Sequence, residues 1–184
     1  MVRKLLCRLR FASDVAVCES PEDDSTLNDR YSLWHDLPQE HVVLFLDFGG
    51  VLHTKHSADY ALMNVLERLL DKCPALYIVI IDPFRKSYSR TYLIALFKAE
   101  YFFDRLLGIT QDFSKGIAAY HRAEECQGFV FTHRIKHYLI VDDDAYLYPH
   151  QFPFIVNVDG NAGLNDEMAQ IIADKYAVAL QASS

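Results

Sequence analysis

Three nearly unbroken apolar runs, each followed at once by an acidic residue, set the strongest limit on the fold of this chain. They span residues 41–46, 76–81 and 138–141. A strand that faces solvent on one side alternates apolar and polar residues, whereas a strand covered on both sides is apolar throughout. The runs therefore predict buried strands of a parallel sheet that helices cover on both faces.

Segments with helical periodicity separate these runs. Helices are expected over 62–70 and 92–97, from Ser114 onward, and from Asn165 or Asp166 onward. Two further short strands are expected, at 106–110 and 154–158. This alternation of strands and helices predicts an α/β fold with a mostly parallel sheet and right-handed crossovers.

The compact domain is expected to begin near residue 41. The first forty residues are basic at 1–11 and acidic at 19–24, which is typical of a short element joined to a mobile linker. We therefore divide the chain into a partly mobile amino-terminal extension, 1–40, and one α/β domain, 41–184. A length of 184 residues suits one domain with a sizeable core.

Charge, hydropathy and cysteine usage narrow the partners and the location. The net charge of −7 argues against broad nucleic-acid binding through phosphates, which needs a basic surface, and leaves a local basic patch open. Because no apolar run approaches the roughly 20 residues that span a bilayer, no membrane association is expected. The 4 cysteines have no Cys-x-x-Cys spacing, which is typical of reduced thiols in a cytoplasmic protein.

Asp47 and the acidic run 142–144 lie where two of the predicted strands end. In an open parallel sheet, ligands bind outside the carboxyl ends of the strands. Converging carboxylates repel one another unless a cation lies between them, and hard oxygen ligands suit Mg²⁺. Aspartates after strands also start turns and cap helices. The residues alone thus leave a magnesium site and a structural role equally open.

Two segments resemble motifs of the haloacid-dehalogenase-like (HAD) hydrolases. Residues 44–53, Leu-Phe-Leu-Asp-Phe-Gly-Gly-Val-Leu-His, are similar to the first motif, and 139–144, Leu-Ile-Val-Asp-Asp-Asp, to the fourth. The chain most resembles the small, nearly capless HAD domains also found in multi-enzyme RNA-repair proteins. In that group a Trp-Arg pair stands where this chain has Phe84 and Arg85, and an Arg-x-x-Glu piece matches 122–125. The resemblance implies a three-layer, Rossmann-like α/β sandwich with little or no cap.

The resemblance also implies roles for individual residues. Asp47 would be the nucleophile that accepts a phosphoryl group as an aspartyl-phosphate. Arg122 would neutralise the phosphate and steady Asp47, while the backbone amides of Phe48 and Gly49 would point at phosphate oxygens. Arg85 is expected beside the same ligand. The implied partner is a phosphorylated small molecule or another phosphate-bearing ligand.

A magnesium centre is implied as well. Its ligands would be the carboxylates of Asp47 and of Asp142 or Asp143, together with the backbone carbonyl of Gly49. Mg²⁺ would shield the carboxylate of Asp47 from the phosphate, because these two groups otherwise repel each other.

Two positions depart from the family pattern. Gly49 replaces the second aspartate of the first motif, which protonates the leaving group, and a general acid typically supplies about 10²–10⁴-fold in rate. Asp82 stands where the second motif offers Ser or Thr, and its charge opposes phosphate binding. His53 is either a substitute for the missing acid or a packing residue.

Two functions follow from this pattern. The first is a magnesium-dependent phosphohydrolase of weak or narrow activity, favoured by Asp47, Arg122 and the acidic run. The second is a catalytically degenerate HAD-like module that binds a protein partner or a phosphorylated ligand through the former cleft. Gly49 and Asp82 favour this second function.

Overall fold

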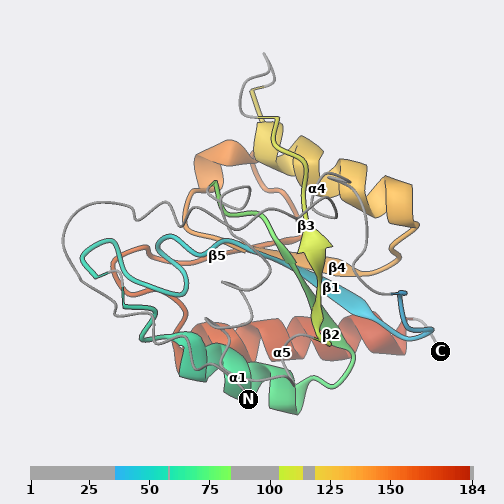
Figure 1. The fold of residues 1–184 in the computed structure, drawn as a ribbon, viewed down its shortest axis with the longest axis horizontal. Helices are drawn as coiled ribbons and strands as arrows, with labels where there is room; N and C mark the ends of the chain where they lie inside the picture. The colour runs from blue at the N-terminus through green and yellow to red at the C-terminus, as the bar shows by residue number, and fades with distance from the viewer. Residues whose placement is uncertain (1–35, 58, 84–103, 114–118, 183–184) are drawn as a thin grey trace, which may run out of the picture.

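The computed structural model describes residues 36–57, 59–83, 104–113 and 119–182. Within these ranges, five parallel strands form one sheet in the order β3-β2-β1-β4-β5 (Figure 1). The strands are β1 (Val42–Leu46), β2 (Leu76–Ile80), β3 (Leu106–Ile109), β4 (Tyr138–Asp142) and β5 (Ile155–Asn157). The predicted α/β class with a parallel sheet is confirmed.

Helices lie on both faces of the sheet. Helices α1 (Met63–Lys72) and α5 (Asp166–Gln181) cover one face, and α4 (His121–His133) covers the other (Figure 1). A single turn of 3₁₀ helix, η3 (Ala145–Leu147), follows β4. The described part of the chain is therefore a three-layer sandwich with a Rossmann-like core.

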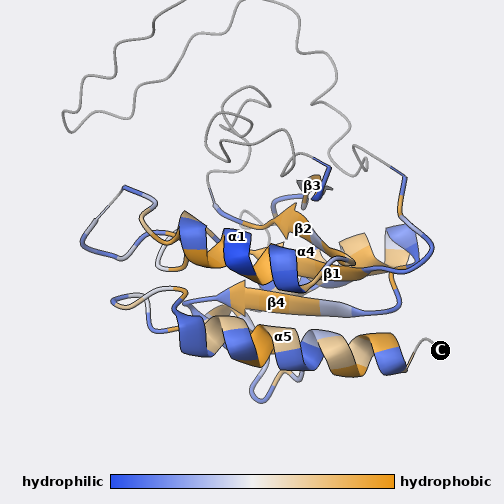
Figure 2. Ribbon diagram, turned by 90° about the horizontal axis from the view of Figure 1, so that it is seen from below, coloured by the Kyte–Doolittle hydropathy of each residue, from blue (hydrophilic) through white to orange (hydrophobic). Residues whose placement is uncertain are grey.

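The burial of the central strand, β1, explains why its sequence does not alternate apolar and polar residues. Every residue of β1 is fully buried. Val42, Leu44 and Leu46 pack into the core that α1 and α5 share, whereas Val43 and Phe45 pack into the core of α4. Both sides of β1 are thus covered by helices. Figure 2 shows the result, with hydrophobic colour along β1 and β2 and a mixture of hydrophobic and hydrophilic colour around α1 and α5.

The predicted strand bounds agree with the structure to within one residue at each end. The first predicted helix, 62–70, corresponds to α1, and the last begins at Asp166. Asn165 caps it, because its side chain accepts the backbone N–H of Met168 at 2.9 Å. The predicted helix at 92–97 and the predicted cap at Ser114 lie outside the described residues.

The division of the chain near residue 41 stays a prediction, since residues 1–35 lie outside the described ranges. No helix within those ranges has both the length and the apolar character that crossing a membrane requires.

Candidate functional site

The pairing of β1 with β4 brings Asp47 and Asp142 together. The two strands run parallel with Leu46 opposite Val141, so the residues that follow lie at the same edge of the sheet. The backbone N–H of Asp47 donates to the carbonyl oxygen of Val141 at 3.0 Å and extends this pairing by one bond. Carboxylates that follow adjacent parallel strands therefore converge, as the sequence predicted.

Asp47, Asp142 and Asp143 form an acidic triad. Each offers a carboxylate oxygen, and these oxygens all lie within 4.8 Å of one another. Asp143 comes this close because two glycines face it, and a Cβ at Gly50 or Gly160 would collide with its carboxylate. Gly50 also has a φ of +68°, in the left-handed region that favours glycine. The geometry of the triad thus depends on both glycines.

Asp142 is held in place by a donor on each oxygen. The Tyr148 hydroxyl donates to Oδ2 at 2.6 Å, and the backbone N–H of Asp144 donates to Oδ1 at 2.9 Å. Burial and the neighbouring Asp142 raise the pKa of Tyr148, so the hydroxyl keeps its proton and remains a donor. No sequence pattern indicates this role, because Tyr148 is one of several aromatic residues that follow β4.

Asp47 lacks such support. The residue is 5% exposed, and its Oδ1 has no hydrogen-bond partner within the described part of the chain. Burial, followed by the charges of Asp142 and Asp82, raises the pKa of Asp47 well above its usual value, and only Arg122 opposes this rise. A bound divalent cation would relieve both the missing partner and the repulsion.

Arg122 brings a positive charge from the first turn of α4. It is 4% exposed, and its Nε and Nη1 atoms have no hydrogen-bond partner among the described residues. Burial lowers the pKa of Arg122, but the carboxylates of Asp142 and Asp47 outweigh this effect and raise it. Its Nε lies 3.9 Å from Oε2 of Glu125, whose Oε1 accepts the backbone N–H of Phe113 at 2.8 Å. The structure therefore places a charged guanidinium in the electrostatic reach of the triad.

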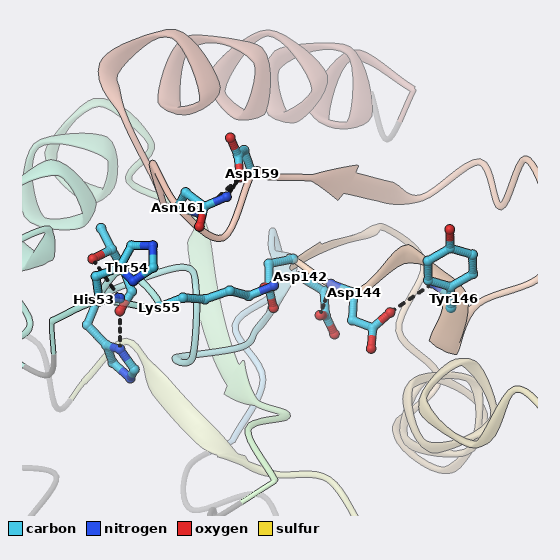
Figure 3. A network of polar contacts seen from close by, with 10 residues as sticks. His53, Thr54, Lys55, Asp142, Asp144, Tyr146, Asp159 and Asn161 are labelled. Carbon is cyan, nitrogen blue, oxygen red and sulfur yellow. Dashed lines mark hydrogen bonds and ion pairs between the residues drawn. The ribbon is translucent and has the colours of Figure 1, made fainter.

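Lys55 is a second cation at this site, and sequence reasoning missed it. Its Nζ lies 2.7 Å from Oδ2 of Asp143, although its side chain is 57% exposed. Figure 3 shows the side chain extending toward Asp142, the last residue of β4, and Asp144 beyond it. The backbone N–H of Lys55 also donates to the carbonyl oxygen of Gly160 at 2.9 Å. The path of the loop after β1 thus sets the position of Lys55, and no motif spacing indicates it.

Gly49 and Asp82 contact each other across the edge of the sheet. The backbone N–H of Gly49 donates to Oδ2 of Asp82 at 3.3 Å, and Asp82 is buried shortly after β2. We expected this amide to face a phosphate oxygen, but a carboxylate of the chain itself accepts its hydrogen. The neighbouring Phe48 is buried, and its carbonyl accepts the N–H of Leu52 at 2.9 Å, which closes the turn after β1.

The predictions for Arg85, His53 and the Gly49 carbonyl have different outcomes. Arg85 lies outside the described residues, as does Phe84. The Nδ1 atom of His53 lies 3.2 Å from the carbonyl oxygen of Thr54 (Figure 3), and the ring packs edge-on against Tyr60. These contacts favour a packing role for His53 over that of a substitute acid. The Gly49 carbonyl as a metal ligand stays a prediction.

The comparison with known families agrees with this geometry. The family model for the HAD domain in Swiss Army Knife RNA repair proteins matches residues 43–169, which is more than half of the chain. The chain belongs to this HAD family. No curated protein and no solved structure matches it. The matched range of the HAD domain includes Asp47, Arg122, Asp142 and Asp143.

The acidic triad of this HAD domain could hold a metal ion. Its three carboxylates are hard oxygen ligands, and Mg²⁺ prefers such ligands together with water. The buried Oδ1 of Asp47 supports this fit, because an anionic oxygen without a partner is costly in a protein interior. A triad of this kind is typical of the magnesium site of HAD proteins.

Proposed function

We propose that this HAD domain is a Mg²⁺-dependent phosphohydrolase of narrow activity that uses Asp47 as its nucleophile. One observation carries the proposal: the buried Oδ1 of Asp47 has no hydrogen-bond partner in the described part of the chain and belongs to the acidic triad. A purely structural aspartate at the end of a strand would be expected to accept hydrogen bonds from a turn or a helix end. An oxygen kept without a donor is available for a metal ion or a phosphorus atom.

The chemistry assigns a separate task to each group. Mg²⁺ held by Asp47 with Asp142 or Asp143 would supply the charge that lets a phosphate approach a carboxylate. A carboxylate oxygen of Asp47 attacks phosphorus, and the bond between phosphorus and the leaving group breaks, so that the leaving group departs with the electron pair. Water then attacks phosphorus, the bond between phosphorus and Asp47 breaks to regenerate the carboxylate, and inorganic phosphate leaves; the proton of the water passes to solvent, because Gly49 offers no base. Arg122 balances the charge of the transferred group.

The residue at position 49 limits the range of substrates. Because Gly49 offers no acid, the leaving group must depart without a proton from this position. Acyl phosphates and anhydrides meet this requirement, whereas alkyl phosphate monoesters do not. A Cβ at Gly49 would lie 3.7 Å from Oδ2 of Asp47, which is an ordinary contact, so an acidic side chain can be introduced there.

A comparison of two substrates tests the proposal. Phosphate release from acetyl phosphate and from an alkyl phosphate monoester would be measured with Mg²⁺ for the native protein, Asp47→Asn and Gly49→Asp. We expect the native protein to prefer acetyl phosphate, Asp47→Asn to release none, and Gly49→Asp to narrow the preference. Turnover by Asp47→Asn at the native rate would show that Asp47 is not the nucleophile.

A second candidate is a catalytically degenerate module that binds a phosphorylated ligand or a protein partner. The hydrogen bond from Gly49 to Asp82 favours it, because this bond engages an amide that phosphoryl transfer would use. This function would be preferred if the native protein consumes neither substrate while Mg²⁺ still raises its melting temperature.

A further inference from the structure

We propose that Asp82 is a built-in anion that holds the Gly49 amide and thereby decides which ligands this site accepts. The site would take a divalent cation readily and a phosphate dianion poorly. This inference rests on the proposed function, since it concerns the same phosphoryl position. It goes beyond that function by assigning a specificity-determining residue shortly after β2.

The first argument is the number of hydrogens on the amide. The backbone N–H of Gly49 has one hydrogen, and Oδ2 of Asp82 accepts it at 3.3 Å. A phosphate oxygen would have to displace or share this acceptor. A carboxylate is a strong acceptor because hydrogen bonds to ionised groups are stronger than neutral ones. Asp82 therefore competes with phosphate for the donor that the turn after β1 presents.

The second argument is the balance of charge. Asp82 adds a fourth carboxylate next to the three of the acidic triad, since it accepts the N–H of Gly49, two residues beyond Asp47 in the chain. Each added carboxylate makes the site more attractive to a cation and less attractive to an anion. Mg²⁺ would therefore bind before a phosphate, and Asp82 would still oppose the phosphate afterwards.

A pair of substitutions separates the two arguments. Asp82→Asn removes the charge but keeps an oxygen that can accept the N–H of Gly49. Asp82→Ser removes the charge, shortens the side chain and supplies a hydroxyl. The matched control is Asp144→Asn, which removes one exposed charge from the same edge of the sheet and keeps an acceptor for the N–H of Tyr146. Melting curves would first show that each variant is folded.

The measurement is calorimetric titration of inorganic phosphate into each protein at saturating Mg²⁺. We expect weak binding by the native protein and a gain of about tenfold or more for Asp82→Ser, the equivalent of one hydrogen bond to a charged group. Asp82→Asn should show a smaller gain, and Asp144→Asn little change. If only one Asp82 variant folds, its gain over the Asp144→Asn control decides the matter.

Three results would overturn the proposal. They are native binding of phosphate as tight as that of Asp82→Ser, equal gains for Asp82→Ser and Asp144→Asn, and no gain for either Asp82 variant. None of these depends on turnover, because phosphate binding is read without a reaction. A native protein that is inactive on acetyl phosphate, beside an Asp82→Ser variant that binds phosphate, would refute the proposed function and support the role of Asp82.

Discussion

Replacing Asp47 with Asn should stabilise the protein when Mg²⁺ is absent. The substitution removes one of three carboxylates whose oxygens lie within 4.8 Å of one another. Two unit charges at that separation repel by about 3 kcal/mol at an effective dielectric constant of about 20. Asp47 has two such neighbours in the triad, and the loss of its attraction to Arg122 offsets part of the relief. We therefore expect a net gain of about 1–3 kcal/mol in the free energy of unfolding.

The dependence on pH follows from the raised pKa of Asp47. A carboxyl whose pKa is higher in the folded state opposes folding once it is ionised, so the native protein loses stability as pH rises from 3.8 through the folded pKa. Asp47→Asn lacks this loss. Its advantage should grow as pH rises from 3.8 toward the folded pKa of Asp47 and should shrink toward zero as pH falls below 3.8.

The assay is thermal melting of both proteins in a chelator and again in a series of Mg²⁺ concentrations. For a domain of this size, each kcal/mol corresponds to a shift of about 2–4 °C in Tm. Mg²⁺ at a hundred times its Kd adds about 2.7 kcal/mol to a protein that binds it only when folded, so the native protein should gain more than the variant. Asp144→Asn, which removes an exposed charge beside the triad, is the control and should change little.

Two results would refute this reasoning. If Asp47→Asn melts below the native protein in chelator, then repulsion within the triad does not dominate at Asp47. If Mg²⁺ raises the Tm of both proteins equally, then Asp47 is not a metal ligand. Either result would leave the family membership intact and would count against Asp47 as a metal ligand under repulsion from its neighbours.

Three further substitutions, one of them with a matched control, test the surroundings of the triad. Tyr148→Phe should lower the free energy of unfolding by about 1–3 kcal/mol in urea titrations, because a buried carboxylate loses a donor at 2.6 Å; an unchanged midpoint would contradict this. Lys55→Met should tighten Mg²⁺ binding in calorimetry, since the ammonium that now pairs with Asp143 no longer competes, and weaker binding would show that Lys55 supports the metal site. Gly160→Ala should weaken Mg²⁺ binding, because the added Cβ collides with Asp143. The control is Gly128→Ala on α4, where the added Cβ meets open space. This control should stabilise the protein by about 0.5–1 kcal/mol and leave its Mg²⁺ affinity unchanged.

Most of the fold could be predicted from the sequence because the apolar pattern of each single segment shows whether that segment is buried. Residues 42–46 are covered on both faces, and a strand in that position tolerates no polar side chain. The start of α5 was predicted for a similar reason, since Asn165 caps the helix through a contact only three residues away. The order of the strands follows from pairing between distant segments, which the sequence pattern does not contain.

The candidate site could be predicted only in part. The convergence of Asp47 with Asp142 and Asp143 was predicted because each follows an apolar run and parallel strands end at one edge. Lys55 and Tyr148 were missed, since each reaches the triad along a loop whose path depends on the packing of the whole domain. A contact of this kind leaves no periodic signal in the sequence.

Asp82 was predicted only in part, and it links the two properties that we propose for the site, cation binding and selection against phosphate. Its charge was expected to oppose phosphate, but its hydrogen bond to Gly49 could not be predicted from residues so far apart in the chain. Among the described residues, the carboxylates of the triad and of Asp82 outnumber the cations Arg122 and Lys55. A bound Mg²⁺ would offset these carboxylates, and a phosphate dianion would then add negative charge again. Metal binding would thus be favourable whether or not catalysis follows, and turnover would require a substrate that reacts without prolonged binding. An acyl phosphate, which transfers its phosphoryl group without help from an acid, meets that requirement.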